Sequence, residues 1–449
     1  MSNDTHGTPP ETPPETLWHH QDFMRFWAGQ SVSQVGSAIT TIALPLAAIA
    51  VLKASAFEVG LLTAATFTAF IFIALPAGAI VDRRAKRKIM IWCDVARLVV
   101  IGSVPVATLL GVLTMAQLFA VALVAGVFTV FFDVSYQSYV PVLLGRDRLM
   151  DGNGKLGASR SFAQVAGPGL AGLLVGLVGV AGAVTADAFS YLVSVASLLL
   201  IRTPENPPER AQGNHRSLRA DMAEGLGFVW RHRDLRRITA CSATGNLFVA
   251  MEMSLSVLFL VRVVHVSPAL TGLLIALASL GGVAGAVLSG PLARRIGTPR
   301  ILWFAPLVFG LPNLFIPLAQ PGWGVVLFPV GSAASAFASV IYNVSQLSYR
   351  QAACPPELLG RMSAAIRWVA WGALPLGGLL AGLCASVAGI RLALAIAVSG
   401  YWAAGLLIYF SPLRTRRKAS ALASAPAVLR RLTVMAGLPR ARAAGRVPA

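Results

Sequence analysis

Long apolar segments alternate with short polar connections along most of the chain. Each apolar segment has about twenty residues, which is the length a helix needs to cross a hydrocarbon core of about 30 Å. Barrel strands are much shorter, and only helices or closed barrels satisfy their backbone in lipid, so the pattern predicts about twelve membrane-spanning helices. The segments begin near Phe26, Phe57, Ile89, Met115, Leu156, Ala181, Ile238, Ala269, Ile301, Trp323, Ala364 and Arg391.

The composition agrees with this reading. Of the 449 residues, 56% are hydrophobic and 12% are charged, and the mean hydropathy is +0.70, which is far from the balance of soluble proteins. The four cysteines are scattered in or beside apolar segments without a CxxC spacing. Neither a disulfide framework nor a zinc site is therefore predicted, and we expect no cofactor.

The basic residues are placed asymmetrically. Of the 37 Lys and Arg residues, 30 lie in alternate connections or in the C-terminal tail, while the opposite connections hold almost none. This is the positive-inside pattern, which places the basic connections and both termini in the cytoplasm. Anionic membrane lipid explains the basic surface, and we do not expect nucleic-acid binding.

The chain repeats itself. The connection 78–88, GAIVDRRAKRK, has a weaker copy at 290–300, and Leu143 to Arg146 recurs as Leu358 to Arg361. Two halves in the same orientation predict a parallel repeat around a central cavity. The predicted division is an N-terminal tail (1–25), a six-helix bundle (26–201), a central loop with a short amphipathic helix (202–237), a second six-helix bundle (238–412) and a basic tail (413–449).

Two stretches carry a resemblance to a known family. The connection 78–88 resembles the signature of the major facilitator superfamily, with Gly78, Asp82 and Arg83 at the marked positions. The stretch 131–174 resembles the branch with enterobactin exporters and macrolide efflux proteins. Within this stretch, a motif similar to the antiporter motif of the fifth helix contains Gly167, Pro168 and Gly172. The resemblance implies an all-α integral membrane protein with two six-helix bundles.

Three carboxylates lie within apolar segments, two of them deep and Asp187 in the outer half of the sixth, where an ionised group is costly unless it is paired or faces water. Asp133, Glu252 and Asp187 are these residues. Burial favours the protonated form of a carboxylate, so such a group can load and release a proton near neutral pH. We expect Asp133 or Glu252 to carry protons, and the alternative is a structural carboxylate satisfied by neighbouring groups.

A second set of charges lies near the cytoplasmic connections. Asp94 and Arg97 are spaced to share one helix face, and together with Asp82 and Arg83 they predict an inner gate in the loop that begins at Gly78. The alternative is interfacial snorkelling. Two arginines, Arg160 and Arg367, lie early in later segments and are candidates for the same gate.

Polar side chains at helical spacing mark the candidate path. The resemblance implies that the first, fourth, seventh and tenth helices line it, and polar stripes fall on all four. Hydrogen bonding between helices is the alternative for each stripe. The path residues that we expect are Gln30, Gln34, Ser37, Phe132, Tyr136, Asn246, Tyr342, Asn343 and Gln346.

These observations predict a monomeric secondary transporter of the bacterial plasma membrane rather than an enzyme. No P-loop or hydrolase signature is present, so the energy source is expected to be a gradient. We expect export of amphipathic small molecules such as siderophores, antibiotics or drugs, in exchange for protons. An importer of the same fold is the alternative, and a membrane sensor or enzyme is a more distant one.

Overall fold

The computed structural model describes residues 17–144, 148–205, 218–355 and 358–414. All regular elements in these ranges are helical. This is the outcome expected in lipid, because a helix satisfies its own backbone hydrogen bonds without help from solvent.

The first half begins with α1 (Gln21–Leu46), which a π-helical turn extends to Val51. Helix α5 runs for 52 residues but is interrupted at Gly179, whose φ of 74° and ψ of 176° are not helical. A residue with a side chain rarely adopts this positive φ, so the glycine allows one helix to end and the next to start. The remaining helices of this half are α2 (Ala56–Asp82), α3 (Lys86–Leu109) and α4 (Met115–Leu144), and α5 spans Leu149–Leu200.

The second half repeats this order. Its ninth crossing is irregular, because after a short α9 the chain continues to Leu318 as π and 3-10 helix. Gly389, with φ of 83°, separates α11 from α12 as Gly179 divides α5. The elements are α7 (Arg233–Arg262), α8 (Pro268–Ile296), α9 (Thr298–Phe304), α10 (Leu327–Ala353), α11 (Leu359–Ala388), α12 (Ile390–Ala404) and α13 (Leu406–Tyr409).

The number of crossings agrees with the prediction. Eleven continuous helical stretches of the described chain are long and apolar enough to span a membrane, and the longest of them, 50 residues, contains the break at Gly179. Division at that glycine gives twelve crossings. The predicted all-α membrane fold is thereby confirmed.

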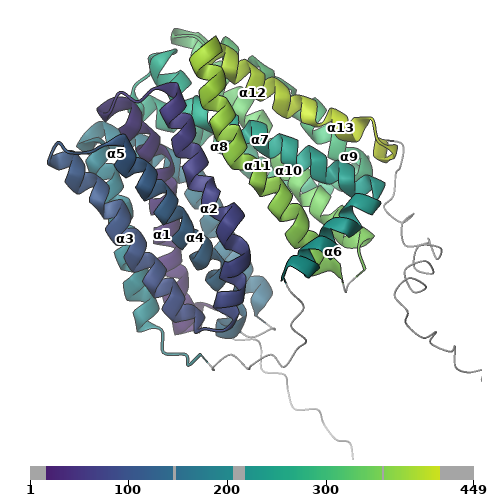
Figure 1. Cartoon of the computed structure of the whole chain (residues 1–449), viewed down its shortest axis with the longest axis horizontal. Coiled ribbons are helices and arrows are strands. Elements are labelled where there is room, and N and C mark those ends of the chain that lie inside the picture. The colour runs from purple at the N-terminus through teal and green to yellow at the C-terminus, as the bar shows by residue number, and fades with distance from the viewer. Residues whose placement is uncertain (1–16, 145–147, 206–217, 356–357, 415–449) are drawn as a thin grey trace, which may run out of the picture.

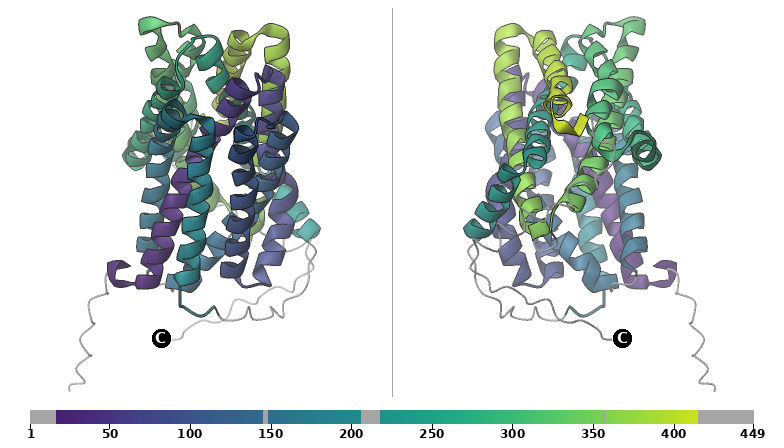
Figure 2. Two further views of the ribbon diagram at one scale, coloured as in Figure 1. Left: turned by 90° about the vertical axis from the view of Figure 1, so that its left-hand side faces the viewer. Right: turned by 90° about the vertical axis from the view of Figure 1, so that its right-hand side faces the viewer.

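The two halves form two bundles that lean against each other (Figure 1). Across the boundary, α2 packs on α11 and α5 packs on α8. The short helix α6 (Leu218–Arg231) lies between the halves in sequence and packs on α11. Side views show the described N-terminal end and the connection before α3 at the same end of the molecule (Figure 2). We call this end the basic side, and the opposite end the far side.

Five glycines bring the bundles into close contact near the far side. A Cβ atom on Gly60 of α2 would lie 2.5 Å from the carbonyl oxygen of Gly378 and 2.8 Å from the nitrogen of Gly382, both in α11. A Cβ on Gly172 of α5 would lie 2.8 Å from the Cα of Gly272 in α8. Small residues permit such backbone contact between membrane helices. We call these two contacts the glycine seal.

The glycine seal follows the internal repeat. Gly272 follows Gly60 at an offset of 212 residues, and Gly382 follows Gly172 at 210. The α2–α11 contact is therefore the counterpart of the α8–α5 contact. From this seal the bundles diverge towards the basic side (Figure 1).

Candidate functional site

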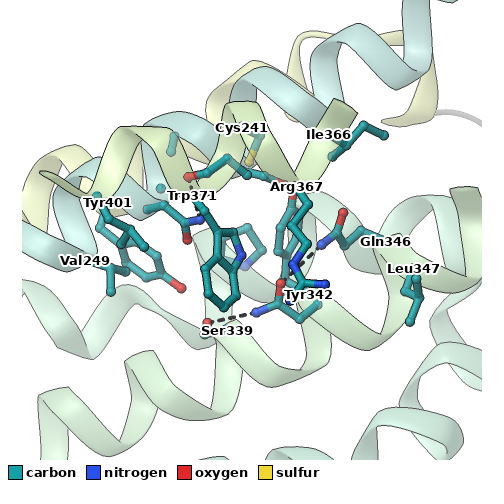
Figure 3. A pocket seen from close by; sticks show the side chains of 18 of the residues that line it. Cys241, Val249, Ser339, Tyr342, Gln346, Leu347, Ile366, Arg367, Trp371 and Tyr401 are labelled. Atoms are coloured by element: carbon teal, nitrogen blue, oxygen red, sulfur yellow. Dashed lines mark hydrogen bonds between the residues drawn. The ribbon is translucent and has the colours of Figure 1, made fainter. Parts of the chain in front are cut away.

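A cavity of about 620 Å³ lies on the inner face of the C-terminal bundle. Its walls come from α7, α10, α11 and α12, and Phe67 of α2 reaches it from the other bundle. Tyr342, Arg367, Trp371 and Tyr401 surround the space (Figure 3). A cavity of this size and mixed lining is typical of small-molecule sites.

Amides and hydroxyls give this cavity its polar wall. The Ser242 Oγ and the Tyr342 hydroxyl lie 2.9 Å apart, and the Asn246 side chain donates to the Ala370 carbonyl over 2.8 Å. The Gln346 amide donates to Asn343 Oδ1 over 3.2 Å. Four of the path residues predicted from the sequence thus line the cavity, namely Asn246, Tyr342, Asn343 and Gln346.

A second cavity of about 410 Å³ lies between α2, α4 and α11. It shares Arg367 and Trp371 with the first cavity and contains Asp133 and Gln137 of α4. At its edge the Trp368 indole donates to the Ile71 carbonyl over 3.3 Å, which joins α11 to α2. The two cavities together form a space with walls from both bundles.

Arginines dominate the charges around this space. Asp133 interacts electrostatically with Arg97, Arg160 and Arg367. The first cavity is lined by Arg350 and Arg367, and its described lining contains no carboxylate. Arg367 lies with its guanidinium carbon 5.2 Å from the ring centroid of Trp371.

The predicted path residues of the N-terminal half lie elsewhere in this state. Gln30 donates to Ser194 Oγ over 3.2 Å, and Ser37 lies 3.1 Å from the Tyr191 hydroxyl. Tyr136 stacks on Phe26 at 5.6 Å between ring centroids. These contacts are internal to the N-terminal bundle. Neither cavity described above is lined by Gln30, Gln34, Ser37, Phe132 or Tyr136.

The predicted gate residues are divided between two environments. Asp94 and Arg97 form a buried ion pair inside the N-terminal bundle, and the Arg97 guanidinium lies over the Phe132 ring at 4.3 Å. Arg83 is exposed at the end of α2, and the Asp82 side chain lies outside the described part of the structure. Among the described residues no ion pair joins Arg83 to the buried pair.

The other two predicted proton carriers lie inside separate bundles. Asp187 is fully buried and lies 3.2 Å from the Ser190 hydroxyl, beside Thr40 and Tyr191. Glu252 accepts a hydrogen bond from Asn313 Nδ2 over 3.3 Å, and Asn313 belongs to the irregular part of the ninth crossing. Neither carboxylate lines the two cavities.

Two of the antiporter-motif residues contact neighbouring helices. A Cβ atom on Gly167 would lie 2.3 Å from the Ala38 side chain of α1. Gly172 belongs to the glycine seal, and Pro168 lies inside α5 between them. From the sequence we expect this motif to allow close packing between helices, and the positions of the two glycines are compatible with that role.

Sequence reasoning missed several cavity residues. Phe67, Trp371 and Tyr401 are aromatic residues in apolar segments, where nothing in the sequence separates a cavity wall from a lipid-facing surface. Arg350 carried a usable signal, since it follows Gln346 by four residues and therefore extends the polar stripe of α10. No cluster of three or more metal-ligating side chains occurs within the described ranges.

Two leaning helical bundles, related by an internal repeat and separated by a cavity on one side, define a membrane transporter of the major facilitator class. A family model described as Transmembrane secretion effector (MFS_3) matches residues 16–437. The chain belongs to this family.

Three relatives of this chain are exporters by name. The multidrug efflux pump Tap of Mycobacterium tuberculosis (strain ATCC 25618 / H37Rv) is 28% identical over 389 residues, which cover 82% of this chain and 88% of that protein. Macrolide efflux protein A of Streptococcus pyogenes is 25% identical, covering 82% of this chain and 90% of that protein. The enterobactin exporter EntS of Salmonella paratyphi A is also 25% identical, covering 80% of this chain and 86% of that protein.

Solved structures show the same fold. A bacterial homologue of the iron transporter ferroportin in an inward-facing state superposes with a TM-score of 0.71 at 15% identity, covering 88% of this chain and 99% of that chain. The nucleoside transporter NupG gives a TM-score of 0.72 at 12% identity, covering 86% of this chain and 98% of that chain.

Proposed function

We propose that this protein exports amphipathic small molecules from the bacterial cytoplasm, with protons as the exchanged ion. The observation that carries the proposal is the space formed by the two cavities, which has walls from both bundles and in which aromatic side chains lie beside amides and hydroxyls. Such a lining suits solutes that combine an apolar body with a few polar groups. Relatives named as multidrug, macrolide and enterobactin exporters support the direction and the solute class.

The orientation follows from the basic residues. The positive-inside rule assigns the basic side to the cytoplasm, and applied to the sequence it assigns both termini to the same compartment. The glycine seal then closes the periplasmic end, and the bundles diverge towards the cytoplasm. In this state the cavity takes up solute from inside the cell, and rocking of the bundles would expose it to the outside.

We assign proton exchange to Asp133. Of the three candidate carboxylates, Asp133 alone lines either of the two cavities described above. Its electrostatic partner Arg367 belongs to the other bundle, so the protonation state of Asp133 affects the attraction between the two bundles. A proton on Asp133 removes that attraction, which gives a physical link between proton binding and the opening of the space between the bundles.

The test uses inverted membrane vesicles that contain the full chain. An interior-acidic pH gradient is imposed, and uptake of a panel of amphipathic compounds is measured. Gradient-dependent uptake that stops when an ionophore collapses the gradient supports proton-driven export. Uptake only into right-side-out vesicles would instead favour an importer, and absence of flux for the whole panel in both orientations would refute transport of this solute class.

Asp133→Asn provides the matched variant. We expect it to abolish gradient-dependent flux while solute binding to the purified protein is retained, because asparagine keeps the shape but cannot exchange a proton. Glu252→Gln and Asp187→Asn are the comparisons. If either of them abolishes coupling while Asp133→Asn retains it, the assignment moves to that carboxylate.

A further inference from the structure

Arg350 is a cation that the proposed exchange does not use. It lies in the last turn of α10 and lines the cavity of about 620 Å³, which we call the central cavity. Its Nε atom is buried and has no hydrogen-bond partner within the described structure. No described carboxylate lies within ion-pair distance of its guanidinium. A guanidinium that is half-buried and has no described counter-ion is destabilised, so a ligand that supplies negative charge there gains free energy.

Arg367, which also lines the two cavities, differs from Arg350 in its surroundings. Arg160 and Arg367 both act on Asp133, which partly compensates their charge. Arg350 does not contribute to the electrostatics of Asp133 and interacts instead with Tyr342. The cavity therefore has a compensated charge cluster beside α4 and an uncompensated positive charge on α10.

The surroundings of Arg350 suit an aromatic or apolar anion. Tyr342 and Trp371 point into the same space (Figure 3) and offer flat apolar surfaces. A guanidinium binds carboxylate, sulfonate or phosphate through paired N–H donors. Aromatic walls around such a charge can hold the apolar body of the same solute.

We propose that the central cavity selects organic anions, with Arg350 binding the anionic group and Tyr342 and Trp371 packing against an aromatic or apolar body. The inference rests on the proposed function, because it names the solute class that the same cavity exports. It also changes the energetics of export. An interior-negative membrane potential drives an anion outward and a proton inward, so both movements of the exchange gain from the potential.

The experiment compares two dyes that share a xanthene ring and differ in charge. Fluorescein is the anionic probe and tetramethylrhodamine methyl ester is the cationic probe. Binding to the purified full chain is followed by fluorescence polarisation. We expect fluorescein to bind at least about tenfold more tightly, as one charge-assisted contact predicts. Equal binding, a preference for the cation, or binding of neither dye would overturn the inference.

Variants then assign the preference to Arg350. Arg350→Gln should weaken fluorescein binding by about tenfold or more, and Arg350→Lys should restore part of it, because it keeps the charge but not the paired donors. Arg295→Gln removes the same charge from an exposed position of α8 and should leave binding unchanged. If Arg350→Gln binds fluorescein like the parent protein, Arg350 only complements the helix C-terminus, and the proposal is wrong. The comparison of the two dyes on the parent protein does not depend on any variant folding.

Vesicle flux separates this inference from the proposed function. Anion-selective binding without gradient-driven flux would support the anion site and refute the export proposal. Gradient-driven flux of the cationic dye alone would support export and overturn the anion site. Gradient-driven flux of fluorescein that is lost in Arg350→Gln would support both.

Discussion

Gly172 of the glycine seal offers the sharpest test of the alternating mechanism. In Gly172→Ala the added Cβ would lie 2.6 Å from the Pro268 carbonyl oxygen and 3.0 Å from that of Ala269. Ordinary contacts begin near 3.4 Å, so α5 and α8 must separate by roughly 0.8 Å at this point. The clashing atoms belong to the backbone of α8 and cannot rotate away.

The magnitude follows from the cost of overpacking, which is about 1–3 kcal/mol for an added methyl-sized group. In the proposed rocking mechanism, the penalty applies only to the state in which the far side is closed, because the two helices would separate there in the other state. The ratio of the two states should therefore shift about 5- to 150-fold towards the state open at the far side. A state populated at about 1% would become readily detectable.

The assay is a distance measurement across the far side. Spin labels are placed at Leu110, which follows α3, and at Trp323, which precedes α10, with exposed fractions of 70% and 94%. The four native cysteines are replaced first. In Gly172→Ala we expect a longer distance population to grow. Gly157→Ala is the matched control, since it lies in the same helix with no atom within 4 Å of the added Cβ.

Two outcomes would refute this reasoning. If a folded Gly172→Ala protein has the distance distribution of its parent, the seal does not discriminate between the two states. If Gly157→Ala produces the same shift, the effect comes from glycine replacement in α5 and not from the contact with α8. Gly60→Ala, at the counterpart contact with α11, should repeat the behaviour of Gly172→Ala.

Three further predictions follow from individual contacts. Arg97→Leu leaves the buried Asp94 carboxylate without its ion-pair partner and should lower the free energy of unfolding by about 3–5 kcal/mol. Thermal unfolding measures this loss, and the double variant that also carries Asp94→Leu should recover part of it. Asn313→Ala removes the described hydrogen-bond donor to Glu252 and should lower the midpoint of thermal unfolding, whereas Asn313→Gln keeps an amide donor and should lower it less. Equal midpoints for the parent and the alanine variant would mean that this hydrogen bond contributes nothing to stability. Trp371→Ala enlarges the cavity and removes an aromatic wall, so it should weaken binding of aromatic solutes by about tenfold, and unchanged affinity in a titration would show that the ring is not part of the site.

The sequence predicted the fold closely but the site only in part. Gly179 and Gly389 separate helices where the sequence shows no polar loop, yet the expected crossings near Ala181 and Arg391 begin beside them. For the cavity, the residues predicted on the polar stripe of α10 extend as far as Gln346 and line the cavity, but the prediction ends one turn before Arg350, which lines it as well. The stripe of α1 has the same spacing as that of α10. In this state its Gln30 and Ser37 nevertheless bond to the sixth crossing.

The sequence by itself determined the number of crossings, the helical fold, the repeat of two halves and the distribution of positive charge. These properties depend on local quantities, namely the length of apolar segments, their match to the thickness of the membrane, and the net charge of each connection. Only the tertiary structure decided which polar side chains face the cavity, because this depends on how each helix is rotated against its neighbours. It also decided which end is closed, since the contact of Gly172 with Gly272 joins residues that are far apart in the chain and depends on the tilt between the bundles.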